Sequence, residues 1–77
     1  MQRLVIGQLQ RGDVLYSTRE AQPPLVFDRL IERGTTRTPA GYKLGRKSSR
    51  WKMGRHMLKA LGYTVVKRDE QTFTLSV

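Results

Sequence analysis

Residues 50–77, RWKMGRHMLKALGYTVVKRDEQTFTLSV, hold the strongest structural pattern in the chain. Residues 50–61 place their apolar side chains on one side of a helical wheel, and Gly62 has the conformational freedom that commonly ends a helix. Residues 63–77 alternate between apolar and polar types and are rich in β-branched and aromatic residues, with a turn at 69–71. This order predicts a helix followed directly by a β-hairpin.

The alternation within the predicted hairpin also assigns its side chains to faces. Tyr63 and Val65 are two residues apart on the first strand, so they are expected to point to the same side. Phe73, Leu75 and Val77 have the same spacing on the second strand and would form the matching apolar face. One face of the hairpin should therefore pack against the rest of the domain.

The N-terminal part of the chain has shorter patterns. Residues 3–9 and 13–18 read as two short strands, and Gly12 in the turn between them can adopt a positive φ. Residues 25–33, LVFDRLIER, have apolar side chains at i, i+3 and i+4 and follow Pro24, a favourable residue for the first turn of a helix. These patterns predict an N-terminal hairpin and a supporting helix.

The segment between the two predicted helices is rich in Gly, Pro, Ser and Thr, which is typical of a loop. A short strand around 42–44 is compatible with it. The elements together predict a single α+β domain with a winged-helix-like architecture. Its parts are an N-terminal β-hairpin in 1–20, a supporting helix at 25–33, a basic loop at 35–49, a recognition helix at 50–61 and a wing hairpin at 63–77, all within residues 1–77.

Residues 54–77 contain a Gly-Arg pair entering the helix, a Leu-x-x-Leu-Gly-aromatic close and basic residues before the hairpin turn. The residues in this pattern are Gly54, Arg55, Leu58, Leu61, Gly62, Tyr63, Lys67 and Arg68. The pattern resembles the winged-helix segment at the C-termini of phage and plasmid primase-helicase proteins. The resemblance implies a DNA-binding wing domain, of mobile-element origin and without catalytic function.

The composition excludes several classes of function. The 77 residues include no cysteine and a single histidine, His56, so disulfides, thiolate zinc sites and multi-histidine metal sites are excluded. No apolar run approaches the about 18 residues that cross a bilayer, and the N-terminus does not fit a signal peptide. No acid–base pair suits catalysis, and 41–49 lacks the order of a phosphate-binding loop. We expect a cytoplasmic protein that is not an enzyme and uses no metal or cofactor.

The net charge of +9 is concentrated in one segment. Residues 33–68 contain eleven Lys or Arg and no Asp or Glu, whereas residues 1–32 are neutral overall. Such a segment cannot neutralise itself locally, so it forms either a solvated basic surface or a site for a polyanion, most commonly nucleic acid. A membrane partner is not expected, because the segment has no wide apolar face backed by bulky aromatics.

Four side chains of the predicted recognition helix form one stripe. Lys52, Arg55, His56 and Lys59 have the i, i+3, i+4, i+7 spacing, and such a helix fits the major groove of duplex DNA. Arg55 is the best candidate for reading a guanine edge. The full set of candidate nucleic-acid-binding residues is Arg37, Lys43, Arg46, Lys47, Arg50, Lys52, Arg55, His56, Lys59, Lys67 and Arg68.

These observations favour a small basic protein that binds duplex DNA as a regulator, for example of transcription, or as a nucleoid-associated accessory factor. Specific sites would need a homodimer or tandem binding, because one recognition helix binds weakly. An alternative is a mobile-element inhibitor that places its basic face on an acidic or nucleic-acid-binding partner protein. A third hypothesis is RNA or single-strand binding, with stacking on Tyr42 and Trp51. It ranks below duplex DNA, since the chain lacks the closely spaced aromatics of an RNA-recognition sheet.

Overall fold

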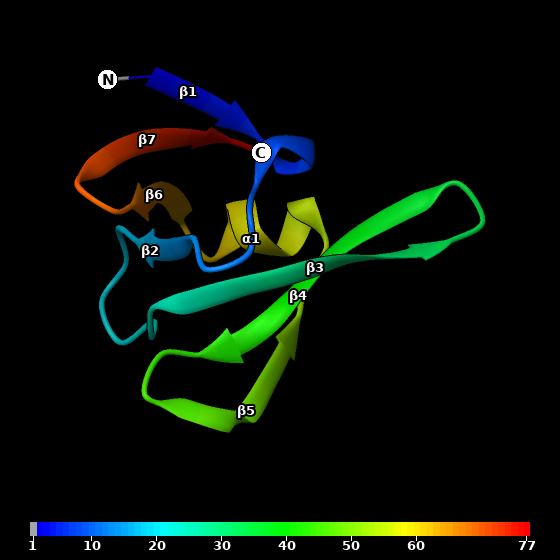
Figure 1. Cartoon of the computed structure of the whole chain (residues 1–77), viewed down its shortest axis with the longest axis horizontal. Coiled ribbons are helices and arrows are strands. Elements are labelled where there is room, and N and C mark those ends of the chain that lie inside the picture. Colours follow the sequence, from blue (N-terminus) through cyan, green and yellow to red (C-terminus); the bar gives the residue numbers. More distant parts are fainter. Residues whose placement is uncertain (1) are drawn as a thin grey trace.

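Residues 2–77 are described by the computed structural model, and most of them lie in β-strands (Figure 1). One short α-helix and one 3-10 helix accompany the strands. The elements are β1 (Gln2–Val5), η1 (Ile6–Gln8), β2 (Val14–Ser17), β3 (Leu25–Arg33), β4 (Thr36–Lys43), β5 (Arg46–Lys52), α1 (Arg55–Ala60), β6 (Tyr63–Arg68) and β7 (Gln71–Ser76).

The strands form one seven-stranded mixed sheet in the order β1-β7-β6-β2-β3-β4-β5. Neighbouring strands are antiparallel except for β1, which lies parallel to β7. The prediction of an α+β winged helix with two helices is therefore wrong. Figure 1 shows β3 and β4 as a long twisted ribbon that projects beyond the other strands.

The C-terminal hairpin of β6 and β7 confirms the predicted wing hairpin as a local structure. The predicted faces are wrong in β6, because Tyr63 and Val66 are buried and Val65 is only half-buried. Tyr16 and Ser17 are adjacent in β2, yet their partners in β6 are Val65 and Tyr63, so β6 has a β-bulge with one extra residue. The bulge shifts the alternation by one, and Tyr63 and Val66 come to share the core face.

Residues 25–33 form β3 rather than the predicted supporting helix. Leu25 and Phe27 alternate as strand residues do and are buried in the core. A bulge then occurs at Asp28, and Leu30 is the next side chain that packs on the core. The extra residue of the bulge gives the inward-facing Phe27 and Leu30 a spacing of three, which imitates the period of a helix.

Residues 35–49 contribute most of β4 and β5, so the predicted basic loop is also wrong. Gly41 is required by packing, since the Trp51 indole lies beside it and donates a 3.2 Å hydrogen bond to the Val26 carbonyl. A Cβ at Gly41 would collide with that carbonyl oxygen. Pro39 is tolerated in β4 because β5 has ended at this level, so the ladder does not need a donor there.

The helix α1 is half as long as the predicted recognition helix at 50–61. Gly54 precedes it in an extended conformation, and Gly62 follows it with a φ of 80°, which confirms the predicted role of Gly62 at the helix end. Residues 50–52 complete β5 instead, and Trp51 enters the core from that strand. Pairing with β4 thus overrides the local helical pattern.

The predicted N-terminal hairpin does not form. β1 pairs with β7, which places Leu4 opposite Leu75, and β2 pairs with β3 and β6. Gly12 has the expected positive φ of 95°, but its N–H donates to the Phe27 carbonyl at 2.9 Å rather than closing a hairpin. The apolar side of β1 therefore extends the core beside the C-terminal strand.

The hydrophobic core lies on the face of the sheet where α1 packs through Leu58. Phe73 and Leu75 confirm the predicted apolar face of β7, and Val77 packs partly against it. The buried core residues are Leu4, Leu9, Leu15, Leu25, Phe27, Trp51, Leu58, Tyr63, Val66, Phe73 and Leu75. None of the helices in the described part of the chain has the length and apolar character needed to cross a bilayer.

Candidate nucleic-acid interface

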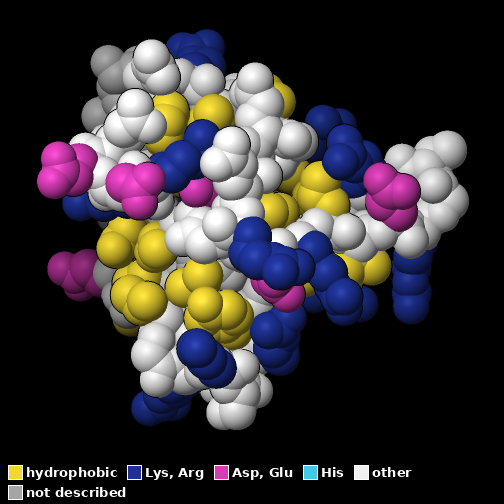
Figure 2. Space-filling view, viewed as in Figure 1, with side chains coloured by type: hydrophobic (Ala, Val, Ile, Leu, Met, Phe, Trp, Pro, Cys, Tyr) yellow, Lys and Arg dark blue, Asp and Glu magenta, His cyan; other side chains and the backbone are white. Residues whose placement is uncertain are grey.

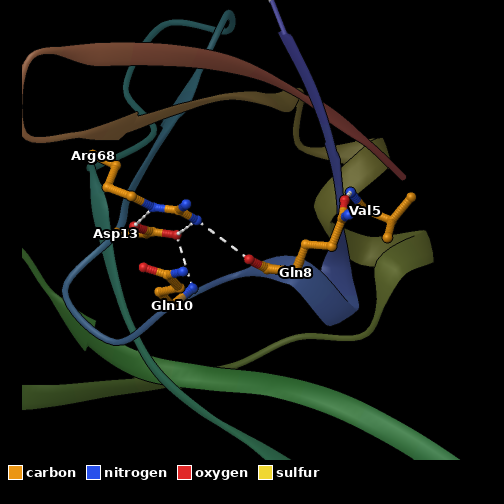
Figure 3. A network of polar contacts seen from close by, with 5 residues as sticks. All are labelled: Val5, Gln8, Gln10, Asp13 and Arg68. Atoms are coloured by element: carbon orange, nitrogen blue, oxygen red, sulfur yellow. Dashed lines mark hydrogen bonds and ion pairs between the residues drawn. The ribbon is translucent and has the colours of Figure 1, made fainter.

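Arg68, one of the predicted binding residues, is used inside the fold (Figure 3). Its guanidinium donates two 2.8 Å hydrogen bonds to the Asp13 carboxylate, which is 1% exposed, and one of 3.2 Å to the Gln8 carbonyl. The Gln10 N–H donates to the same carboxylate at 2.8 Å, and the Val5 N–H donates to the Gln8 side chain at 3.0 Å. The hydrogen bond to Asp13 raises the pKa of Arg68. Arg68 therefore ties β6 to the segment before β2, with its Nε and Nη2 donors occupied.

Asp28 holds two further arginines. Its carboxylate lies 3.0 Å from Arg11 and 3.0 Å from Arg50. The hydrogen bond from Arg50, with the charge of Arg11, lowers the pKa of Asp28. The Arg50 guanidinium also lies 5.8 Å from the centre of the Tyr42 ring. Arg50 is thus anchored on two sides, although it remains exposed.

Arg37 has a looser partner. Glu32 lies 3.4 Å away on the neighbouring strand, and both side chains are mostly exposed. An exposed pair of this kind contributes less than about 1 kcal/mol, so it leaves Arg37 available to a stronger anion. The remaining Lys and Arg side chains in residues 2–77 form no ion pair.

The basic cleft is a hollow of about 780 Å³ between η1, the β3–β4 ribbon and the start of α1. Arg37 lines it from β4, and Arg55 and His56 line it from α1; its lining includes no Asp or Glu. An adjoining hollow of about 180 Å³ is lined by Arg55, His56 and Lys59. The lining of the larger hollow also includes hydroxyl groups from Thr35, Thr36, Thr38 and Ser76 and apolar side chains from Val5, Ile6, Leu30 and Val77. The fold thus brings four predicted binding residues together.

A second group, the basic tip, consists of Lys43, Arg46 and Lys47 at the turn between β4 and β5. Lys43 and Arg46 are directly opposite each other across the two strands. Lys52 lies at the other end of β5, not on the helix as the stripe pattern predicted. β5 is an outer strand of the sheet, where charged side chains also hinder pairing with other chains. Part of this charge therefore has a structural explanation.

The sheet surface opposite the core combines residues that the sequence singled out with residues that it did not. Residues that pair directly across strands share a face, and one row runs across five strands. The row consists of Lys67 on β6, Val14 on β2, Val26 on β3, Tyr42 on β4 and Arg50 on β5. Tyr16 follows Val14 by two residues on β2 and lies opposite Val65, so these two join the same face.

We call this surface the aromatic face. Figure 2 shows hydrophobic side chains exposed over β2 and the adjoining ends of β3 and β4, with Lys and Arg side chains around them. The Lys67 ammonium lies 5.3 Å from the centre of the Tyr16 ring, a contact that contributes about 0.5–1 kcal/mol at an exposed site. Trp51, the other aromatic considered for stacking, is buried in the core instead. The alternation in DVLYS, residues 13–17, is the sequence signal that could have indicated Tyr16.

The predicted binding residues therefore fall into three groups rather than one helix face. Arg37, Arg55, His56 and Lys59 meet at the basic cleft, Lys43, Arg46 and Lys47 form the basic tip, and Arg50 and Lys67 border the aromatic face. In residues 2–77 no three His, Cys, Asp or Glu side chains lie close enough to share a metal ion. No protein-family model, curated protein or solved structure matches the chain.

Proposed function

We propose that this protein binds nucleic acid, with the basic cleft and the basic tip in contact with phosphates. The observation that carries the proposal is the cleft, whose lining includes Arg37, Arg55 and His56 but no Asp or Glu side chain. Like charges gathered in a concave site repel one another and strengthen the local positive potential. A polyanion is the ligand that relieves this repulsion.

The other groups of the cleft support the same ligand. Thr35, Thr36 and Ser76 bring hydroxyl groups to the lining, and hydroxyl donors commonly contact phosphate oxygens in nucleic-acid complexes. The basic tip adds further cations, of which Arg46 and Lys47 are exposed and Lys43 is half-buried. A strand that contacts both groups would be held mainly through its backbone.

The helix α1 is too short to be a good candidate for reading bases in the major groove of a duplex. Its six residues make a helix of about 9 Å, less than two full turns. Lys52 lies on β5 and is not part of its polar stripe. We therefore propose that binding is electrostatic first, with Arg55 and Lys59 as phosphate ligands rather than base readers.

Fluorescence anisotropy across a salt series tests this proposal. The probes are labelled single-stranded DNA, single-stranded RNA and duplex DNA. Affinity should fall steeply as salt rises, because each neutralised phosphate releases bound counterions. A lack of binding to all three probes at low salt overturns the proposal and would direct attention to an acidic partner protein.

The substitution Arg55→Ala tests the cleft itself. It should lower the affinity and reduce the log–log salt slope by about 0.7–0.9, the effect of one lost phosphate contact. Arg19→Ala is the matched control, because it removes the same charge from an exposed loop residue outside the cleft lining. If both variants change the slope equally, overall charge and not the cleft is responsible for binding.

A further inference from the structure

We infer that the aromatic face binds the unpaired bases of single-stranded nucleic acid by stacking. This inference rests on the proposed function and names the form of nucleic acid that the protein takes. Within residues 2–77, the two helical elements pack on the core face, through Leu58 of α1 and Ile6 of η1. Neither element packs on the aromatic face, where Tyr16 and Tyr42 are half-buried and Val26 is buried.

The register of the strands determines the distance between the Tyr16 and Tyr42 rings. Tyr42 lies in the row of Val14, two strands away from β2, and Tyr16 lies two residues further along β2. Two strand spacings are about 10 Å and two residues are about 7 Å, so the rings are about 12 Å apart on a flat sheet. This separation suits two different bases on one strand rather than one base held between both rings.

The cations beside the two rings, Lys67 and Arg50, add contacts to phosphate and to bases. A base stacked on an aromatic ring gains more than an exposed cation–π contact does, so a base displaces the Lys67 ammonium from Tyr16. The displaced ammonium is then free to contact the adjacent phosphate. Arg50 is held by Asp28, so it remains beside Tyr42, where its planar guanidinium can itself stack on a base.

Tyr63 has a structural role and therefore serves as a comparison for Tyr16 and Tyr42. Tyr63 is fully buried, and its hydroxyl donates a 2.7 Å hydrogen bond to the Pro23 carbonyl. The hydroxyl groups of Tyr16 and Tyr42 form no hydrogen bond with another described residue, and neither side chain belongs to the core. Their rings are thus held in place by the sheet while their polar ends remain free.

The geometry favours single strands over duplexes for a physical reason. In a duplex, both faces of each base are already stacked on neighbouring bases, and only the edges are accessible. An unpaired strand presents the faces of its bases, which an aromatic ring on a sheet surface can cover without regard to sequence. DNA and RNA share these faces and phosphates, so the inference covers either kind of single strand.

The test compares binding of Tyr16→Leu and Tyr16→Phe with that of the wild type. The probes are labelled oligonucleotides of about 12 nucleotides, within the range of known single-strand sites, as DNA, as RNA and as duplex DNA. Wild type should prefer the single strands at every salt concentration. Tyr16→Leu should weaken single-strand binding about 5- to 100-fold, with the salt slope and duplex binding unchanged, and Tyr16→Phe should retain it because the ring remains.

The outcomes separate the two proposals. If the wild type binds all probes and Tyr16→Leu leaves single-strand affinity unchanged, the stacking inference fails while nucleic-acid binding stands. If the wild type binds no probe, the proposed function fails. If one of the two single-stranded probes binds more tightly than the other and more tightly than the duplex, the inference is supported, and the result shows whether the protein prefers DNA or RNA. Should Tyr16→Leu not fold, Tyr16→Trp replaces it: the added indole should be quenched by single strands, and an unquenched signal overturns the inference.

Discussion

The core face and the aromatic face of the sheet are built from the same strands but hold different kinds of side chain. On β2, Leu15 is fully buried in the core, while the adjacent Tyr16 is half-buried on the other surface. On β6, the same step separates the buried Val66 from the exposed Lys67. Strand alternation therefore divides residues that maintain the fold from residues that we assign to base stacking. Substitutions on the two faces should have separable effects.

The largest expected effect is that of Trp51→Ala on the core face. The indole is 5% exposed, packs beside Gly41 and donates to the Val26 carbonyl. Its loss should lower the free energy of unfolding by about 3–5 kcal/mol, a large part of the stability of a domain this small. Denaturant titration followed by circular dichroism measures this loss. Unchanged stability with lost single-strand binding would mean that Trp51 contacts the ligand and that the division between the faces is wrong.

The next effect concerns the charged contact between Asp13 and Arg68. Asp13→Ala leaves a guanidinium that is largely removed from water without its carboxylate partner, because the Arg68 side chain is 21% exposed. We expect a loss of about 3 kcal/mol in the free energy of unfolding, measured by the same titration. The double variant Asp13→Ala with Arg68→Met is the control. It should recover part of the loss, and strictly additive losses would show that the two side chains act independently.

The smallest effect is the pH dependence from Asp28, which lies beside Arg50 at the border of the aromatic face. The hydrogen bond from Arg50 lowers the pKa of Asp28 below its ordinary value of 3.8. A lowered pKa means that ionised Asp28 stabilises the folded state above pH 3.8, and this stabilisation is lost as the pH falls through the folded-state pKa.

Thermal melts of the wild type and Asp28→Asn measure this contribution. The wild type should melt slightly higher near neutral pH, because the arginines that pair with Asp28 are largely exposed to solvent, and the two curves should converge in acid. A difference that persists at a pH well below the folded-state pKa of Asp28 would contradict a role for its charge.

The sequence predicted a local element well where the alternation of inward and outward side chains is not interrupted by a β-bulge. β7 alternates regularly from Gln71 to Ser76, and its inward residues Phe73 and Leu75 are buried as predicted. The bulges disturb this period in β3 and β6, so Leu30 and Val66 fall on the core face where simple alternation does not place them. A bulge depends on pairing with a distant strand, and no window of local sequence contains that information.

The candidate site was predictable in its charge and not in its arrangement. The excess of Lys and Arg in residues 33–68 is evident from the sequence. The acids that occupy three of these arginines come from outside the segment, with Asp13, Asp28 and Glu32 reaching Arg68, Arg50 and Arg37. Pairing between strands decides which cations remain free.

The sequence by itself determined the net charge of +9, the absence of cysteine chemistry and the C-terminal hairpin, because composition and local alternation are properties of the chain alone. Only the tertiary structure decided that residues 25–33 form a strand, that Trp51 enters the core from β5 rather than from a helix, and that Tyr16 and Tyr42 share a surface. These features depend on hydrogen bonds between strands far apart in the chain. Such non-local pairing outweighs the weak helical propensity of short segments.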